Sequence, residues 1–75
     1  MIRSVVIIGS GNLAEALARA VAASPLSLRQ VFGRNRDRVA AVAALSGTVG
    51  ESDPSRLARA DIYLIAVSDA AVAEV

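Results

Sequence analysis

The chain alternates short apolar runs with longer segments in which apolar residues recur every three or four positions. The first run, Val5-Val6-Ile7-Ile8, is β-branched and ends at a glycine, which predicts a buried strand. Residues 12–23 carry an apolar stripe and an i,i+4 charge pair, which predict a helix that Ser24-Pro25 ends. The stripe is Leu13, Leu17 and Val21 with Ala14 and Ala18 beside it, and the pair is Glu15 with Arg19.

The second half of the chain repeats this alternation. Residues 28–33 predict a second strand, and the stripe of Val39, Val42 and Leu45 predicts a second helix that Asn35 caps. Gly47 follows at the position where a left-handed cap is common.

Shorter elements follow that helix. Thr48-Val49-Gly50 is a candidate third strand, and Asp53-Pro54 predicts a short helical turn through Leu57. Residues 62–67 predict a continuous apolar strand, with Tyr63 in the core, and Ser68 or Asp69 starts another helix. Strand–helix alternation with short connections implies right-handed crossovers and a parallel sheet.

Composition fits such a sheet and excludes several function classes. The hydrophobic fraction is 55%, almost all aliphatic, as strands covered on both faces require. A net charge of +1 gives no field to attract nucleic acid or an acidic membrane. The chain has no cysteine and no histidine, which excludes a disulfide framework, a cysteine nucleophile, a His-based metal site and a His-containing triad from this segment. We therefore expect no metal site here and a cytoplasmic location.

The N-terminus does not read as a targeting segment. Its uninterrupted apolar run, Val5–Ile8, is shorter than the roughly 7–15 residues of a signal-peptide core. No apolar run approaches the roughly 20 residues that a membrane-spanning helix needs.

A glycine motif joins the first strand to the first helix. Gly9-Ser10-Gly11-Asn12-Leu13-Ala14 is a G-x-G-x-x-A, in which Gly9 allows the tight turn, Gly11 lets a diphosphate approach the backbone, and Ala14 keeps the helix close to the sheet. Free amides at the start of that helix then face the anion. Glycines that only make a turn are the alternative, whereas a P-loop is excluded because no Lys-Ser/Thr pair follows. We predict the N-terminal half of a Rossmann doubly wound α/β sheet, of three-layer αβα type, with strand order 3-2-1-4.

The end of the second strand indicates which dinucleotide is bound. NAD and FAD sites usually have an acid about 20 residues past the glycines, to hold the ribose hydroxyls. Here Gly33-Arg34-Asn35-Arg36 stands instead, with no acid before Asp37. A guanidinium grips a 2′-phosphate with a fork of donors, so we predict NADP(H), with Arg34 as the first candidate contact and Arg36 as the second. Asn35 either contacts the nucleotide or caps the helix, and an arginine-rich solvated surface is the alternative for the whole turn.

The end of the fourth strand completes the candidate site. It is expected to lie next to the first strand, at the switch point where the strand order reverses and Rossmann ligands bind. We therefore expect the nicotinamide side of the coenzyme to be lined by Ala66, Val67 and Ser68. Ser68 either bonds the ribose or diphosphate, or caps the next helix.

These segments resemble the N-terminal domain of pyrroline-5-carboxylate-reductase-like proteins, and more narrowly the Rossmann-like proteins with a DUF2520 C-terminal domain. The resemblance rests on the glycine motif, on Phe32-Gly33-Arg34-Asn35-Arg36 and on Ala60 to Asp69. It implies NADP binding by the glycine loop and the Arg/Asn turn. It also implies a separate helical domain that builds the substrate pocket and often dimerises, so we expect residues 1–75 to be an incomplete NADP-binding domain of a homodimer.

Two functions are consistent with these features. The first is the NADP(H)-binding portion of a reductase that acts on an imine, a keto acid or a similar small substrate. The second is a sensor or scaffold that binds NADP without turnover, since the fold alone does not imply catalysis. A methyltransferase or flavoprotein fits less well, because both usually have an acid near the end of the second strand. No catalytic residue is assigned, because the segment contains no His, Lys or Cys as a proton donor.

Overall fold

The computed structural model describes residues 3–66, which form a four-stranded parallel sheet with two helices. In chain order the elements are β1 (Ser4–Ile8), α1 (Asn12–Ala22), β2 (Ser27–Phe32), α2 (Arg36–Leu45), β3 (Val49–Glu51), the 3₁₀ turn η1 (Pro54–Arg56) and β4 (Ile62–Ile65). Neighbouring strands are parallel and lie in the order β3-β2-β1-β4. The α/β fold and the strand order predicted from the sequence are therefore confirmed.

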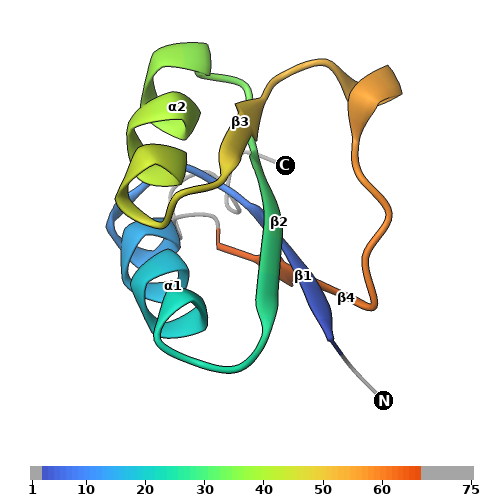
Figure 1. Cartoon of the computed structure of the whole chain (residues 1–75). Helices are drawn as coiled ribbons and strands as arrows, with labels where there is room; N and C mark the ends of the chain where they lie inside the picture. Colours follow the sequence, from blue (N-terminus) through green and yellow to red (C-terminus); the bar gives the residue numbers. More distant parts are fainter. Residues whose placement is uncertain (1–2, 67–75) are drawn as a thin grey trace.

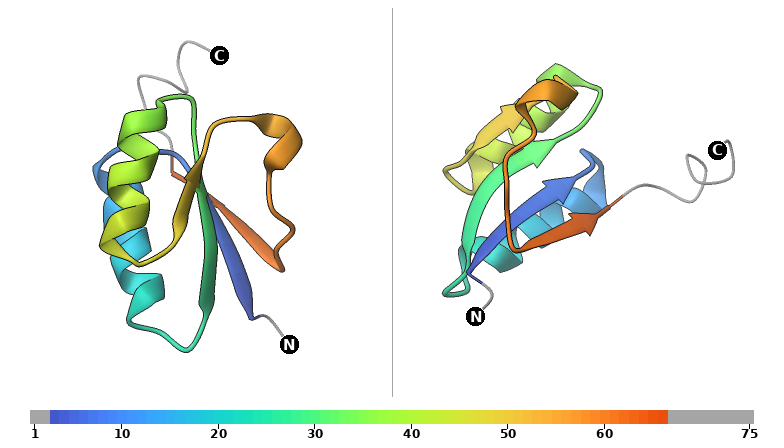
Figure 2. Two further views of the ribbon diagram at one scale, coloured as in Figure 1. Left: turned by 45° about the horizontal axis from the view of Figure 1, so that its top comes forward. Right: turned by 90° about the vertical axis from the view of Figure 1, so that its right-hand side faces the viewer.

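Within residues 3–66 the two helices cover one face of the sheet. Figures 1 and 2 show α1 and α2 side by side on that face, with the connection from β3 to β4 on the opposite face. Val31, Ile7 and Leu64 lie in register across β2, β1 and β4 and pack in the helix-side core. This single contiguous cluster holds the carboxyl ends of the strands in place.

Both helices pack against the sheet through alanines together with part of their predicted apolar stripes. α1 buries Ala14, Ala18 and Val21, whereas Leu13 is 55% exposed. α2 buries Val42 and the adjacent Ala43, whereas Leu45 is 49% exposed. Alanine has no side chain beyond Cβ, so it lets a helix backbone lie closer to the strands than leucine does. The outermost members of the two predicted stripes, Leu13 and Leu45, therefore lie exposed, while their other members pack toward the sheet.

A bulge in β2 decides which of its side chains face the helices. The register with β1 shifts by one residue between Val5, which pairs with Leu28, and Val6, which pairs with Gln30. Arg29 is the extra residue, so Leu28 and Val31 both pack on the helix side while Gln30 lies on the other face.

On the face opposite α1 and α2, two polar side chains hold the β3–β4 connection over the sheet. Gln30, Val6 and Tyr63 lie in register across β2, β1 and β4. The Gln30 side chain is 5% exposed, donates to the Arg56 carbonyl at 3.1 Å and accepts from the Ala58 amide at 2.9 Å. Because the connection lies over this rung, Val6 is fully buried although neither α1 nor α2 covers it.

Tyr63 contributes a second attachment for the same connection. Its hydroxyl donates to the Ala58 carbonyl at 2.8 Å and accepts from the Ala60 amide at 3.2 Å. The residue is 40% exposed, so the expectation that Tyr63 lies in the core is corrected: it is a partly exposed polar support.

Asp61 fixes the start of β4 to the start of β1. Its Oδ2 accepts from the amides of Arg3 at 2.8 Å and Ser4 at 3.0 Å, and its own amide donates to the Ser4 carbonyl at 3.1 Å. The bonds that Oδ2 accepts, first that from the Arg3 amide and then that from the Ser4 amide, lower the pKa of Asp61 from its usual value of 3.8.

The Gln30 attachment predicts a graded loss of stability. Replacing Gln30→Met keeps the length of the side chain but leaves the Arg56 carbonyl and the Ala58 amide without their partner. We expect a loss of about 1–3 kcal/mol in the free energy of unfolding, measured by urea denaturation. Tyr63→Phe removes bonds at a more exposed site, so its loss is expected to be smaller, about 0.5–1.5 kcal/mol. The reverse order would contradict this view of the connection.

The Asp61 contacts predict a pH dependence. A carboxyl whose pKa is lower in the folded chain stabilises the fold above its unfolded pKa, and loses that effect as the pH falls through the folded pKa. Asp61→Asn is therefore expected to unfold at lower urea concentration than the wild type at pH 7. The gap is expected to close as the pH falls below 3.8, the ordinary pKa of the group. A gap that stays constant with pH would show that the charge plays no part.

Candidate nucleotide-binding site

Three of the predicted site residues meet at the carboxyl edge of the sheet. The Gly9 amide donates to the Phe32 carbonyl at 2.7 Å, and the Ala66 amide donates to the Ile8 carbonyl at 2.7 Å. A Cβ added to Gly33 would lie 3.7 Å from the carbonyl carbon of Gly9. The ends of β2, β1 and β4 therefore lie side by side at the switch point, where ligands of such sheets bind.

Gly9 occupies a position that no other residue fits. Its φ of 139° is strained for a residue with a side chain, and a Cβ there would clash with the carbonyl of Ala66. The first glycine of the motif thus permits the turn, as predicted, and also allows β1 and β4 to converge just below the loop.

Gly11 differs from Gly9 because no other part of residues 3–66 crowds it. It is the N-cap of α1, with φ −87° and ψ −164°, which other residues also adopt, and a Cβ there would meet no atom of the described residues within 4 Å, apart from its chain neighbours. The amides of residues 10–14 find no acceptor among residues 3–66, and the first bond into α1 runs from the Glu15 amide to the Gly11 carbonyl. A run of free amides at the positive end of a helix dipole is suited to bind an anion.

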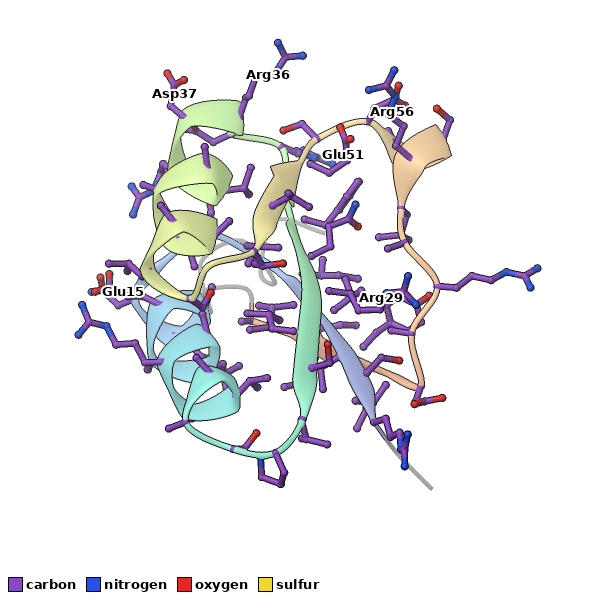
Figure 3. The ribbon with its side chains drawn as sticks, viewed as in Figure 1. Glu15, Arg29, Arg36, Asp37, Glu51 and Arg56 are labelled. Atoms are coloured by element: carbon purple, nitrogen blue, oxygen red, sulfur yellow. The ribbon has the colours of Figure 1, made fainter. Side chains whose placement is uncertain are left out.

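The predicted Arg/Asn turn lies exposed between β2 and α2. Arg34, Asn35 and Arg36 are all exposed. Asn35 caps α2, because its Oδ1 accepts from the Arg38 amide at 3.1 Å, which supports the capping alternative for this residue. Figure 3 shows Arg36 and Asp37 pointing outward from the first turn of α2, away from the sheet.

Arg38 is the residue of this region that the sequence did not single out. Its Nε donates to the Ser10 carbonyl at 3.4 Å, which brings a guanidinium from α2 against the glycine loop. The only signal in the sequence was its place as the third arginine in Arg34-x-Arg36-x-Arg38, and spacing alone does not show that the third arginine turns back toward the loop.

The remaining predicted residues lie outside the described part or show no contact that assigns them a role. Val67 and Ser68 lie outside residues 3–66, as does the helix predicted after them. Leu13, at the second position of α1, is exposed beside the free amides.

A shallow hollow of about 270 Å³ on α1 does not coincide with the glycine loop. Asn12, Glu15, Ala16 and Arg19 line it. Glu15 and Arg19 form a 3.0 Å ion pair there, which an i,i+4 spacing favours. Figure 3 places Glu15 on the outer side of α1, and its carboxylate would repel a phosphate. Within residues 3–66 no group of acidic, His or Cys side chains is suited to hold a metal, and no helix is long and apolar enough to cross a membrane.

Comparison with known proteins agrees with this geometry. The family model described as NADP oxidoreductase, coenzyme F420-dependent, matches residues 4–75. The chain belongs to this family. A solved structure from Bacteroides fragilis, described as a candidate NADP oxidoreductase, superposes with a TM-score of 0.84 at 28% identity over 97% of the chain. The chain spans 29% of the length of that protein, and a search of curated proteins finds no match.

Membership of this family makes the chain an NAD(P)-binding oxidoreductase-like domain with a Rossmann-like fold.

The two glycines of the loop, Gly9 and Gly11, are expected to respond differently to the same substitution. Gly9→Ala introduces a strained φ and a clash with Ala66, so the free energy of unfolding should fall by more than about 2 kcal/mol. Gly11→Ala puts a methyl group into open space, so stability should change by less than about 1 kcal/mol. Urea denaturation measures both, and an equal loss at the two positions would contradict the geometry.

Proposed function

We propose that this chain is the NADP(H)-binding portion of an oxidoreductase that reduces a small substrate by hydride transfer. The observation that carries the proposal is the run of amides around Gly11 that find no acceptor among residues 3–66. Beside it lies the turn with Arg34 and Arg36, and no acid stands between the end of β2 and Asp37. The first acid after β2 is Asp37, which lies in the first turn of α2 and follows both Arg34 and Arg36. Free amides suit the diphosphate, and a guanidinium suits the extra phosphate of NADP.

The bare backbone at Gly11 supports the fit of this coenzyme. A diphosphate needs close approach to several amides at once, and among residues 3–66 no atom beyond the chain neighbours lies within 4 Å of a Cβ at Gly11, which supports that approach. Arg34 lies at the end of β2, where the adenosine ribose is held in such folds, and it remains our first candidate for the 2′-phosphate. Arg36 is the second candidate.

The coenzyme supplies the hydride when it is bound, and the protein supplies position and electrostatics. In this chain Gly9, Gly33 and Ala66 bring three strand ends together, so the coenzyme would lie across the edge of the sheet. The sequence contains no His, Lys or Cys to donate a proton. We infer that any general acid belongs to a substrate-binding part, to the substrate or to water.

We further propose that the substrate is a small imine or keto acid. The resemblance to pyrroline-5-carboxylate-reductase-like proteins, including those with a DUF2520 domain, favours an imine or a keto acid, handled by a helical domain that also forms a homodimer. A panel of imines and keto acids therefore tests the substrate class, and it should include coenzyme F420, which the family description names. NADPH consumption by a protein that contains this chain, with this panel, separates a reductase from a binding module without turnover.

Arg34→Ala tests the assignment of NADP(H). One charge-assisted contact contributes roughly 1.5–3 kcal/mol, which corresponds to about a 10- to 150-fold change in Kd. We expect the Kd of NADPH to rise by a factor in this range while that of NADH changes little, as measured by fluorescence titration. Arg59→Ala, which removes an exposed arginine of the β3–β4 connection, serves as the charge-matched control.

Two results would contradict the proposal. An equal loss of NADPH and NADH would show that Arg34 does not read the 2′-phosphate. A folded chain that binds neither coenzyme would remove the proposed function altogether.

A further inference from the structure

Arg38 connects the first turn of α2 to the glycine loop between β1 and α1. Its Nε donates to the Ser10 carbonyl at 3.4 Å, across 28 positions of sequence. Its own amide is held by Asn35 at 3.1 Å, so the start of the side chain is fixed to the first turn of α2. That turn is in turn held close to the sheet, because a Cβ on Gly33 or on Gly50 would collide with Val39 at 2.8 Å. The guanidinium therefore reaches the glycine loop from a rigid base.

The bond to Ser10 sets the direction of the neighbouring amide. The Ser10 carbonyl and the Gly11 N–H belong to the same peptide unit, and no peptide bond in the described part of the chain is cis. In a trans peptide the carbonyl and the N–H point in opposite directions. When Arg38 holds the Ser10 carbonyl, the Gly11 amide is turned away from α2 and left without an acceptor among residues 3–66.

We propose that Arg38 is a positioning residue that orients the Ser10–Gly11 peptide so that the Gly11 amide faces the diphosphate. The inference rests on the proposed function and extends it, because it assigns Arg38 a task in the diphosphate part of the site rather than in recognition of the 2′-phosphate. Glycine at position 11 makes the task necessary: without a side chain, the peptide before it has more freedom to rotate.

This role separates Arg38 from Arg34. A residue that reads the 2′-phosphate affects NADP⁺ and leaves NAD⁺ unchanged, whereas a residue that orients the loop affects both to the same extent. Direct attraction of Arg38 to the diphosphate would also affect both, but it would depend on the charge alone and would leave the free loop unaltered.

The experiment compares Arg38→Ala and Arg38→Lys with the wild type, with Arg59→Ala as the control for loss of an exposed arginine. Neither change removes the Asn35 cap, because the cap uses the backbone amide of residue 38. Titration calorimetry with NAD⁺ and NADP⁺ gives the two affinities. Amide NMR spectra of the free chain report the Gly11 environment and whether each variant is folded.

We expect Arg38→Ala to raise the Kd of NAD⁺ and of NADP⁺ by the same factor, about threefold to tenfold, as for loss of one hydrogen bond. The Gly11 amide signal should shift in the free variant while Arg59→Ala leaves it in place. Arg38→Lys keeps the charge but lacks the Nε–H, and it should not restore the wild-type affinities or the Gly11 shift.

Three results would overturn the inference. These are a loss confined to NADP⁺, full recovery with lysine, and an unchanged Gly11 amide in Arg38→Ala. If the folded wild type binds neither nucleotide, the proposed function fails, and the Gly11 shift still decides whether Arg38 orients the loop.

Discussion

The close approach of the Gly9 backbone to Ala66 and Gly33 is the constraint on which the rest of this structure depends. Only a residue without Cβ allows β1 to end so near the end of β4, with a φ of 139°. The turn then delivers the chain directly into α1, and the amides of residues 10–14 are left at the edge of the sheet. The same feature that shapes the fold thus creates the candidate binding site.

Contacts far from this edge of the sheet hold the strands and helices in place. Ala14 and Ala18 let α1 lie close to the helix-side core, and Gln30 holds the β3–β4 connection over the other face. Asp61 connects the amino ends of β1 and β4, at the edge of the sheet opposite the loop. These contacts position the strands on either side of the loop between β1 and α1 without using the amides of that loop.

Much of the fold follows from the sequence because its signals are local. The β-branched run before Gly9, the cap at Asn35 and the left-handed Gly47 each state a backbone geometry within a few residues, and the structure has all three. The faces of the helices were harder to predict. Leu13 and Leu45 are apolar and correctly spaced, yet both are exposed, and alanines share the buried faces with the other residues of the stripes. Closeness of packing depends on the partner surface and not on hydrophobicity alone.

The parts that sequence reasoning missed are long-range. The bulge at Arg29, which turns Gln30 toward the connection, depends on the pairing with β1. The reach of Arg38 to Ser10 depends on how α2 is placed over Gly33 and Gly50. Neither has a local signature. The strand order, by contrast, was predictable because right-handed crossovers between parallel strands leave few arrangements.

The direct test of the account is a crystal structure, with NADP⁺ bound, of a folded protein that contains this chain. The account predicts density for the diphosphate against the amides of residues 10–14, and the 2′-phosphate beside the turn that follows Gly33. Density for the nucleotide at any other place on the sheet, with the glycine loop bare, would contradict it.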